Sequence, residues 1–341
     1  MYAYQLHRGL GIKGLERIQV QSQPLKANEV RVGVCAVALN YRDLEIANGG
    51  VKGAPDITPC SDGAGIVLEI GSAVTKWRPG DRVMASFFPN WIDGPATSYK
   101  TAGSLGARGP GMLAESVVLP DHALVAIPSS LSFVEASTLP CAGLAAWNAL
   151  FVAGSAKPGS SVLLLGTGGV SIWALLLAKA AGLRVLLTSS EDRKLSIASQ
   201  LGADETINYR SVPEWANRVL DLTDGRGVDL VLETSGRNTL GQSMSALRKE
   251  GTVAVVGGTS GWGGEINADA LIDGALRLVG VLVGSRSMAE DLVRFVEAFR
   301  IRPLIDRTYG FADAPSAFEY LSAGRHVGKV VVEIDSGDYT A

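Results

Sequence analysis

The chain has 341 residues, of which 47% are hydrophobic and 19% are charged, and its formal net charge is -3. This composition excludes an intrinsically disordered chain, which needs low hydrophobicity and high charge, and the length predicts two domains. The small negative charge gives no reason to expect nucleic acid or an anionic membrane surface as a partner.

The number of cysteines and the sequence of the first residues indicate the cellular compartment to expect. Three cysteines, Cys35, Cys60 and Cys141, are too few, and odd in number, for a disulfide framework, so they fit a reducing compartment. The first ten residues lack the continuous apolar run of a signal peptide. The most apolar stretch, residues 162–187, is interrupted by charges and glycines and is not typical of a membrane span. We therefore expect a cytoplasmic protein.

The first 125 or so residues are rich in short runs of β-branched residues separated by Gly and Pro turns. Such runs predict a compact, barrel-like and mostly β domain. The expected strands are Glu29–Leu39, Gly63–Ile70, Asp81–Phe88 and Met112–Leu119.

From Ser132 onward, helical segments alternate with short apolar strands. This alternation predicts a doubly wound parallel sheet with helices on both faces, so the expected fold class is α/β plus the β domain. The expected strands are 162–165, 185–187, 228–232, 252–256 and 278–283, and the expected helices are 170–181, 191–201, 213–222 and 240–248. A last strand, Gly328–Ile334, is expected to return to the β domain.

The strand Ser161–Leu165 runs into a glycine turn, and a helix begins at once, with Gly166, Gly168, Gly169 and Val170 at the junction. A pyrophosphate binds well against the free backbone N–H groups and positive dipole end of such a helix, and glycine lets the backbone approach closely. The sequence therefore predicts a dinucleotide site here.

The end of the second strand bears on the choice of cofactor. An acid at this point would bind the ribose 2′-hydroxyl and favour NAD, but the strand ends in Ser189 and Ser190. Glu191–Asp192 follows at a helix start, where acids commonly complement the helix dipole, and Arg193 and Lys194 come next. Hydroxyls and cations suit a 2′-phosphate, so we expect NADPH.

At this point the chain resembles the medium-chain dehydrogenase/reductase superfamily along essentially its whole length. The similar motifs are Asn40–Asp43, Pro59–Gly71, Val74–Val83, Leu139–Trp147 and Gly202–Tyr209, and Phe87–Trp91 resembles a zinc-independent, alcohol-dehydrogenase-like branch. The resemblance implies a GroES-like catalytic domain built from residues 1–127 and 287–341, with a Rossmann domain at residues 128–286 between them.

The departures from that family concern metal. Zinc members place Cys, His, and Cys or an acid where this chain has Asn40, Ser61 and Cys141, and a catalytic zinc needs three protein ligands. Residues 90–111 hold no cysteine for a structural zinc. We therefore expect no metal, although a site made of Cys60, Asp62 and Cys141 remains an alternative.

Without a Lewis acid, oxidation of an unactivated alcohol is hard, whereas a quinone, enone or reactive aldehyde accepts hydride readily. The similarity to quinone oxidoreductases therefore implies reduction of such acceptors. Asn40 is the expected hydrogen-bond partner of the substrate carbonyl, and Tyr41 either donates a hydrogen bond or packs as a wall. Asp43 is expected to order the loop, and Trp91 either lines the substrate cleft or anchors a surface loop.

The resemblance implies further cofactor contacts at the carboxyl ends of strands, where ligands bind such sheets. The expected residues are Tyr209, Gly257, Gly258, Ser285 and Arg286. Lys329 is expected either to approach the cofactor or to be a solvated lysine.

The apolar run Leu276–Val283 is expected to pair with its copy in a homodimer, as in relatives of this fold. Two other functions stay open at this stage. One is an alcohol dehydrogenase with an atypical metal site, and the other is a non-catalytic NADPH-binding protein.

Overall fold

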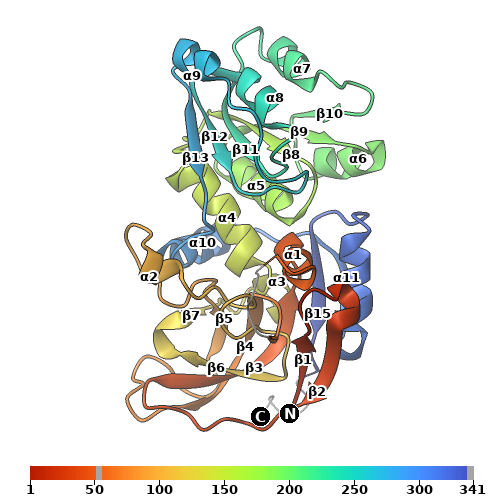
Figure 1. The fold of residues 1–341 in the computed structure, drawn as a ribbon. Coiled ribbons are helices and arrows are strands. Elements are labelled where there is room, and N and C mark those ends of the chain that lie inside the picture. The colour runs from red at the N-terminus through yellow and green to blue at the C-terminus, as the bar shows by residue number, and fades with distance from the viewer. Residues whose placement is uncertain (51–55, 336–341) are drawn as a thin grey trace. The chain divides into compact units, whose positions relative to one another are not determined.

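The structure is a computed structural model that describes residues 1–50 and 56–335 (Figure 1). It divides into a first unit, Met1–Leu144 with Gly284–Ala341, and a second unit, Ala145–Val283. Residues 128–144 thus pack with the first unit, beyond the boundary expected at residue 127. The reason is that Phe133 and Val134, both in α3 (Phe133–Ala136), pack on Ala36, Ala38 and Val331 of the first unit's sheet.

The sheet of the first unit runs in the order β14-β15-β3-β4-β5-β7, and β6 pairs with β3. Neighbouring strands are antiparallel except β14 and β15, which are parallel. The strands are β3 (Glu29–Ala38), β4 (Asp62–Ile70), β5 (Arg82–Ala85), β6 (Ser116–Pro120), β7 (Leu124–Ala126), β14 (Ile305–Gly310) and β15 (Lys329–Glu333).

Strand β3 is the centre of this unit because its β-branched residues fill the core. Val30, Val32 and Val34 are buried at alternate positions, and Phe318 of α11 (Ala314–Ser322) belongs to the same core. The other elements of this unit are β1 (Tyr2–Leu6), β2 (Leu15–Gln19), α1 (Tyr41–Ala47), α2 (Ser98–Thr101) and α10 (Arg286–Ala298).

The expected return of the last strand is confirmed. Strand β15 pairs antiparallel with β3, with Val331 opposite Ala38 and Glu333 opposite Ala36 (Figure 1). The pairing brings Lys329, at the start of β15, close to the end of β3, where Leu39 N–H donates to Val330 O at 3.0 Å.

The sheet of the second unit is parallel and runs in the order β10-β9-β8-β11-β12-β13. This is the Rossmann order, which confirms the predicted fold class. The strands are β8 (Ser161–Leu165), β9 (Arg184–Ser189), β10 (Glu205–Asn208), β11 (Val228–Glu233), β12 (Leu247–Val255) and β13 (Arg277–Gly280). The helices are α4 (Leu144–Trp147) at the unit boundary, α5 (Gly169–Ala180), α6 (Asp192–Gln200), α7 (Trp215–Leu222), α8 (Leu240–Ser245) and α9 (Ala268–Gly274).

Several predicted boundaries were wrong: β5 ends at Ala85 instead of Phe88, β6 begins at Ser116 instead of Met112, and β12 begins at Leu247 instead of residue 252. The helix expected over 240–248 ends at Ser245, because β12 already begins at Leu247 and Arg248 Nε donates to Asp229 of β11. The strand expected over 278–283 ends at Gly280, and Val283 has a positive φ of 46° that a continuing strand does not adopt. Within the described residues, no helix is long and apolar enough to cross a membrane.

Candidate functional site

The glycine turn between β8 and α5 has the geometry of a dinucleotide cradle. Gly166 has a φ of +75°, and Gly168 is the N-cap of α5. A Cβ atom built on Gly166 or Gly168 meets nothing within 4 Å, so open space lies against the N-terminus of the helix. The first N–H groups of a helix lack intrahelical acceptors, so Gly169 and Val170 present donors there. These residues fit a pyrophosphate.

Ser171 stands where the usual fingerprint has a third glycine. Its hydroxyl donates to Leu165 O at 2.7 Å, and the side chain is buried. The serine therefore joins helix to strand instead of obstructing their close packing.

The end of β9 brings several predicted cofactor residues together. Ser189 is buried, and its carbonyl oxygen accepts the Tyr209 N–H at 3.1 Å, so Tyr209 lies beside the strand end with its side chain exposed. Ser190 follows, partly buried, and the Lys194 ammonium lies 3.6 Å from Glu191 Oε1. A hydroxyl, a phenol and a cation thus lie close to one strand end.

The two acids near this strand end already have partners. Asp192 Oδ1 accepts a hydrogen bond from the Asn208 amide at 2.7 Å, and Glu191 pairs with Lys194. Their charges are therefore partly compensated within the unit.

The ends of β11 and β12 lie at the same edge of the sheet as the glycine turn. Thr234 Oγ1 donates to Leu165 O at 3.0 Å, and the buried Glu233 accepts the N–H groups of Ser235 and Gly236. Gly257 and Gly258 follow β12, where a Cβ on Gly257 would lie 3.0 Å from Thr234 O. Only a small residue fits so close to Thr234 O. Glycines therefore follow both β8 and β12 at the carboxyl edge of the sheet.

In the first unit, Asn40 ends the loop after β3 and lies in a buried polar cluster, defined here as Asn40, Asp43, Ser61, Asp62 and Lys329. The side-chain oxygen of Asn40 accepts a hydrogen bond from Lys329 Nζ at 2.6 Å, and the same ammonium donates to Leu39 O at 2.5 Å. Lys329 is 3% exposed and Asn40 is 9% exposed. Sequence spacing could not show this contact.

Asp62, at the start of β4, accepts two hydrogen bonds through its two carboxylate oxygens. The Ser61 hydroxyl donates to Asp62 Oδ1 at 2.7 Å, and the Cys141 N–H donates to Oδ2 at 3.2 Å. Burial raises the pKa of Asp62, while Lys329, Ser61 and the amide of Asn40 act in the opposite direction by favouring the carboxylate.

Asp43 lies in the first turn of α1. Its Oδ2 atom accepts the Asn40 N–H at 2.8 Å, while Oδ1 is buried with no hydrogen-bond partner among the described residues. Burial raises the pKa of Asp43 to about 6. The expected ordering of the loop thus has a visible basis in the bond to Asn40.

The residues at the zinc-ligand places do not form a zinc-binding set. Asn40 and Ser61 replace the usual Cys and His, and Asn40 presents its oxygen to an ammonium group. Burial raises the pKa of the Cys60 and Cys141 thiols. Across residues 1–50 and 56–335, no three His, Cys, Asp or Glu side chains gather closely enough to hold a metal ion.

Four other predicted site residues lie outside these clusters. Ser285 is the N-cap of α10 in the first unit, and the Arg286 guanidinium donates to His122 O at 3.0 Å. The Trp91 indole donates to Gly94 O at 2.8 Å and is buried, so it anchors its loop. Tyr41 is 46% exposed, next to Asn40.

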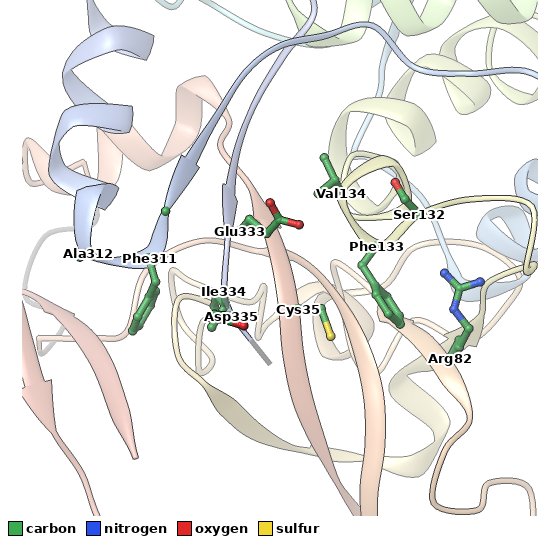
Figure 2. Close-up of a pocket in the computed structure, with 11 residues that line it drawn as sticks. Cys35, Arg82, Ser132, Phe133, Val134, Phe311, Ala312, Glu333, Ile334 and Asp335 are labelled. Atoms are coloured by element: carbon green, nitrogen blue, oxygen red, sulfur yellow. The ribbon is translucent and has the colours of Figure 1, made fainter. Parts of the chain in front are cut away.

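A separate pocket of about 710 Å³ lies in the first unit (Figure 2). Figure 2 shows Phe133 and Arg82 on one side and Phe311 and Ala312 on the other, with Cys35 and Glu333 between them. Its lining shares no residue with the polar cluster, so it adds nothing to that site.

Comparison with known families agrees with this geometry. The alcohol dehydrogenase GroES-like domain matches residues 26–129, and the zinc-binding dehydrogenase family matches residues 169–298. The chain belongs to the medium-chain dehydrogenase/reductase family. The words "zinc-binding dehydrogenase" are the name of that family and do not report a metal in this chain.

Individual relatives cover nearly the whole chain. The zinc-type alcohol dehydrogenase-like protein C1773.06c of Schizosaccharomyces pombe is 42% identical, over 95% of this chain and 97% of that protein. The crystal structure of a putative alcohol dehydrogenase from Sinorhizobium meliloti 1021 is 40% identical, with a TM-score of 0.90 over 97% of this chain and 98% of that chain. The structure of Pseudomonas syringae pv. Tomato DC3000 quinone oxidoreductase is 28% identical, with a TM-score of 0.82 over 97% of this chain and 99% of that chain. The chain is therefore an oxidoreductase, and a nicotinamide cofactor is supported.

Proposed function

We propose that this protein reduces an activated carbonyl, enone or quinone with NADPH and without a catalytic zinc ion. The observation that carries the proposal is the hydrogen bond of 2.6 Å from the Lys329 ammonium to the Asn40 oxygen. It puts a fixed positive charge at a residue that stands in a zinc-ligand place.

Electrostatics and ligand chemistry support the proposed absence of zinc. A zinc ion at Asn40 would have to displace the ammonium from its acceptor, against the repulsion of like charges. Ser61 offers a hydroxyl that already donates to Asp62 at 2.7 Å, and a hydroxyl is a poor substitute for the imidazole or thiolate that zinc prefers.

The choice of NADPH rests on the end of β9. Ser189 and Ser190 supply hydroxyl donors, Tyr209 supplies a phenol, and Lys194 supplies a positive charge. Hydrogen bonds from charged donors to phosphate oxygens are about twice as strong as neutral ones. Asp192 accepts a hydrogen bond from Asn208, and the charge of Glu191 is partly compensated by Lys194, so both acids compete less for a ribose diol.

In this proposal each unit supplies a different group of residues. The bound nicotinamide supplies the hydride, and the glycine turn of the second unit holds its pyrophosphate. The polar cluster of the first unit binds the oxygen of the acceptor, which gains negative charge as hydride arrives, so donors placed there lower the barrier. An electron-poor acceptor suits such a site because it needs no metal to accept hydride.

A turnover screen tests the function. In the reductive assays, the purified protein is mixed with NADPH or NADH and with an ortho-quinone, a cyclic enone or an aromatic aldehyde. In the oxidative assay, it is mixed with the oxidised cofactors and a primary alcohol. We expect oxidation of NADPH with the quinone or the enone and no alcohol oxidation. Failure of every reductive pair, or alcohol oxidation that needs added zinc, would contradict the proposal.

We also propose a homodimer formed through the second unit. Strand β13 is at the edge of its sheet, and Ile272 of α9 and Leu282 after β13 are 76% and 48% exposed. An unpaired edge strand beside exposed apolar side chains is a ready template for pairing with a second copy.

A further inference from the structure

We propose that Lys329 is the residue that binds the acceptor oxygen directly and gives it the proton that completes the reduction. This inference rests on the proposed function and assigns the donor within the polar cluster. It transfers the direct contact from Asn40 to Lys329 and makes Asn40 the residue that positions the ammonium.

The hydrogen bonds of the ammonium leave one donor for a ligand. Lysine has three N–H donors and no acceptor, and here two of them point at Leu39 O and Asn40 Oδ1. For the third, the part of the chain that the structure describes offers no further hydrogen-bond acceptor.

Asn40 is the less suitable donor because both ends of its amide are engaged. Its oxygen must face Lys329, since a lysine ammonium only donates. Its nitrogen lies 3.5 Å from Ala38 O and also favours the carboxylate of Asp62. The amide oxygen of Asn40 therefore positions the ammonium of Lys329.

The ammonium of Lys329 is bound by neutral oxygen atoms and has no carboxylate in direct contact. Among residues 1–50 and 56–335, no carboxylate oxygen lies within 4.0 Å of its ammonium, although Asp62 and Asp43 act on it at longer range. A charge that is buried to 3% exposure and lacks a contact anion interacts strongly with an oxyanion that forms next to it.

The step balances in atoms and charge. Hydride adds to the carbonyl carbon, or to the β-carbon of an enone, and the C=O π electrons become a lone pair on oxygen. That oxygen takes a proton from Lys329 Nζ, which becomes a neutral amine and regains a proton from water. The net reaction consumes one NADPH and one proton for each acceptor reduced.

The first test is kinetic and uses matched variants. Lys329→Met keeps an unbranched, flexible side chain and removes its charge. Lys179→Met makes the same substitution at a lysine bound to Asp204 in the second unit. With the quinone or enone found in the screen, we expect Lys329→Met to lower kcat by about a hundredfold or more, with KM and NADPH affinity changed less than about tenfold. Lys179→Met is expected to keep the wild-type kcat. Equal kcat for Lys329→Met and the wild-type protein would overturn the assignment.

The second test needs no turnover. 4-Nitrophenol resembles the oxyanion once ionised, and its phenolate absorbs visible light. At a pH below its pKa in free solution, with saturating NADP, we expect the wild-type protein to bind it as the phenolate, with its pKa lowered by about one unit or more, and Lys329→Arg to retain part of that shift. Binding as the neutral phenol, or no binding, by the wild-type protein would overturn the assignment even if Lys329→Met failed to fold. A protein that binds the phenolate but reduces no acceptor would contradict the proposed function and leave the donor role of Lys329 supported.

Discussion

The ammonium of Lys329 lies 2.6 Å from the side-chain oxygen of Asn40, although the two residues are 289 positions apart. Because the lysine only donates, the contact fixes that the oxygen end of the Asn40 amide faces Lys329. The polar cluster is thus an ordered set of donors and acceptors, and its order determines what it can bind.

The first prediction concerns metal. We expect the purified protein to contain no stoichiometric zinc, and a chelator to leave its unfolding temperature and its quinone or enone reduction unchanged. The reason is that Asn40 and Ser61 are not zinc ligands and that Lys329 already binds Asn40. Elemental analysis that finds about one tightly held zinc per chain would contradict this prediction, since one catalytic ion is held by three ligands.

The second prediction concerns Asn40. We expect Asn40→Ala to lower kcat by about a hundredfold, the scale seen when one stabilising donor is lost, with a smaller effect on NADPH affinity. The substitution removes the acceptor of Lys329 and lets the ammonium move. Tyr41→Phe is the comparison variant at the half-exposed residue next to Asn40. An unchanged kcat in Asn40→Ala would remove Asn40 from the mechanism.

The third prediction concerns cofactor choice. We expect the protein to bind NADPH at least about tenfold more tightly than NADH, a difference of about 1.4 kcal/mol that one or two hydrogen bonds supply. Lys194→Ala and Ser189→Asp should both reduce this preference, and Ser189→Asp should do so more because it puts a carboxylate beside the phosphate. The measurement is titration with both cofactors at low salt. Equal affinities in the unmodified protein would show that Glu191 and Asp192 determine the choice.

The fourth prediction concerns the pH dependence of stability. The pKa of Asp43 is raised to about 6 in the folded protein, so the folded state keeps its proton to a higher pH than the unfolded state does. The stability that this proton contributes is present below about pH 4 and is lost as the pH rises through about 6. A shift of about two units corresponds to about 3 kcal/mol.

The variant Asp43→Asn isolates this effect, because its side chain is neutral at every pH. We expect the free energy of unfolding of the variant, relative to that of the wild-type protein, to rise by up to about 3 kcal/mol between about pH 4 and about pH 8. Urea denaturation at both pH values measures the difference. A difference between the two proteins that does not change with pH would contradict the raised pKa.

The fifth prediction concerns assembly. We expect the double variant Ile272→Glu with Leu282→Glu to be monomeric at a concentration where the wild-type protein is a dimer, because each charge would be buried without a partner. A loss of about 2 to 3 kcal/mol weakens association by about a hundredfold. Leu10→Glu, at another exposed leucine, should remain dimeric. Light scattering after size exclusion distinguishes the outcomes, and a monomeric wild-type protein would remove the proposal.

The second unit was predictable because its signals are local. The turn at Gly166 and Gly168 and the end of β9 at Ser189 each lie within one strand–helix junction, and the structure places them as expected. The short helix α9 was missed, since none of its residues is buried and it therefore shows no amphipathic pattern.

The polar cluster was only half predictable. Asn40 was found through a motif, but the position of Lys329 depends on the pairing of β15 with β3, and strand register over such a separation is not written in local periodicity. Arg286 was expected near the cofactor because the family resemblance implied a contact there, at the end of an expected strand. In the structure that run breaks at Val283, and the guanidinium bonds to His122 O.

The insertion of β15 between β3 and β14 has a consequence for biosynthesis. The second unit is made from one continuous stretch, so all of its strands leave the ribosome while the first unit still lacks β14 and β15. Until Lys329 emerges, the Asn40 oxygen lacks the donor it has in the finished protein, and one edge of β3 stays open to unwanted pairing. A nascent chain of this protein therefore has every strand of its second unit before it has the lysine that completes the polar cluster, so the hydrogen bond to Asn40 is the later of the two to form.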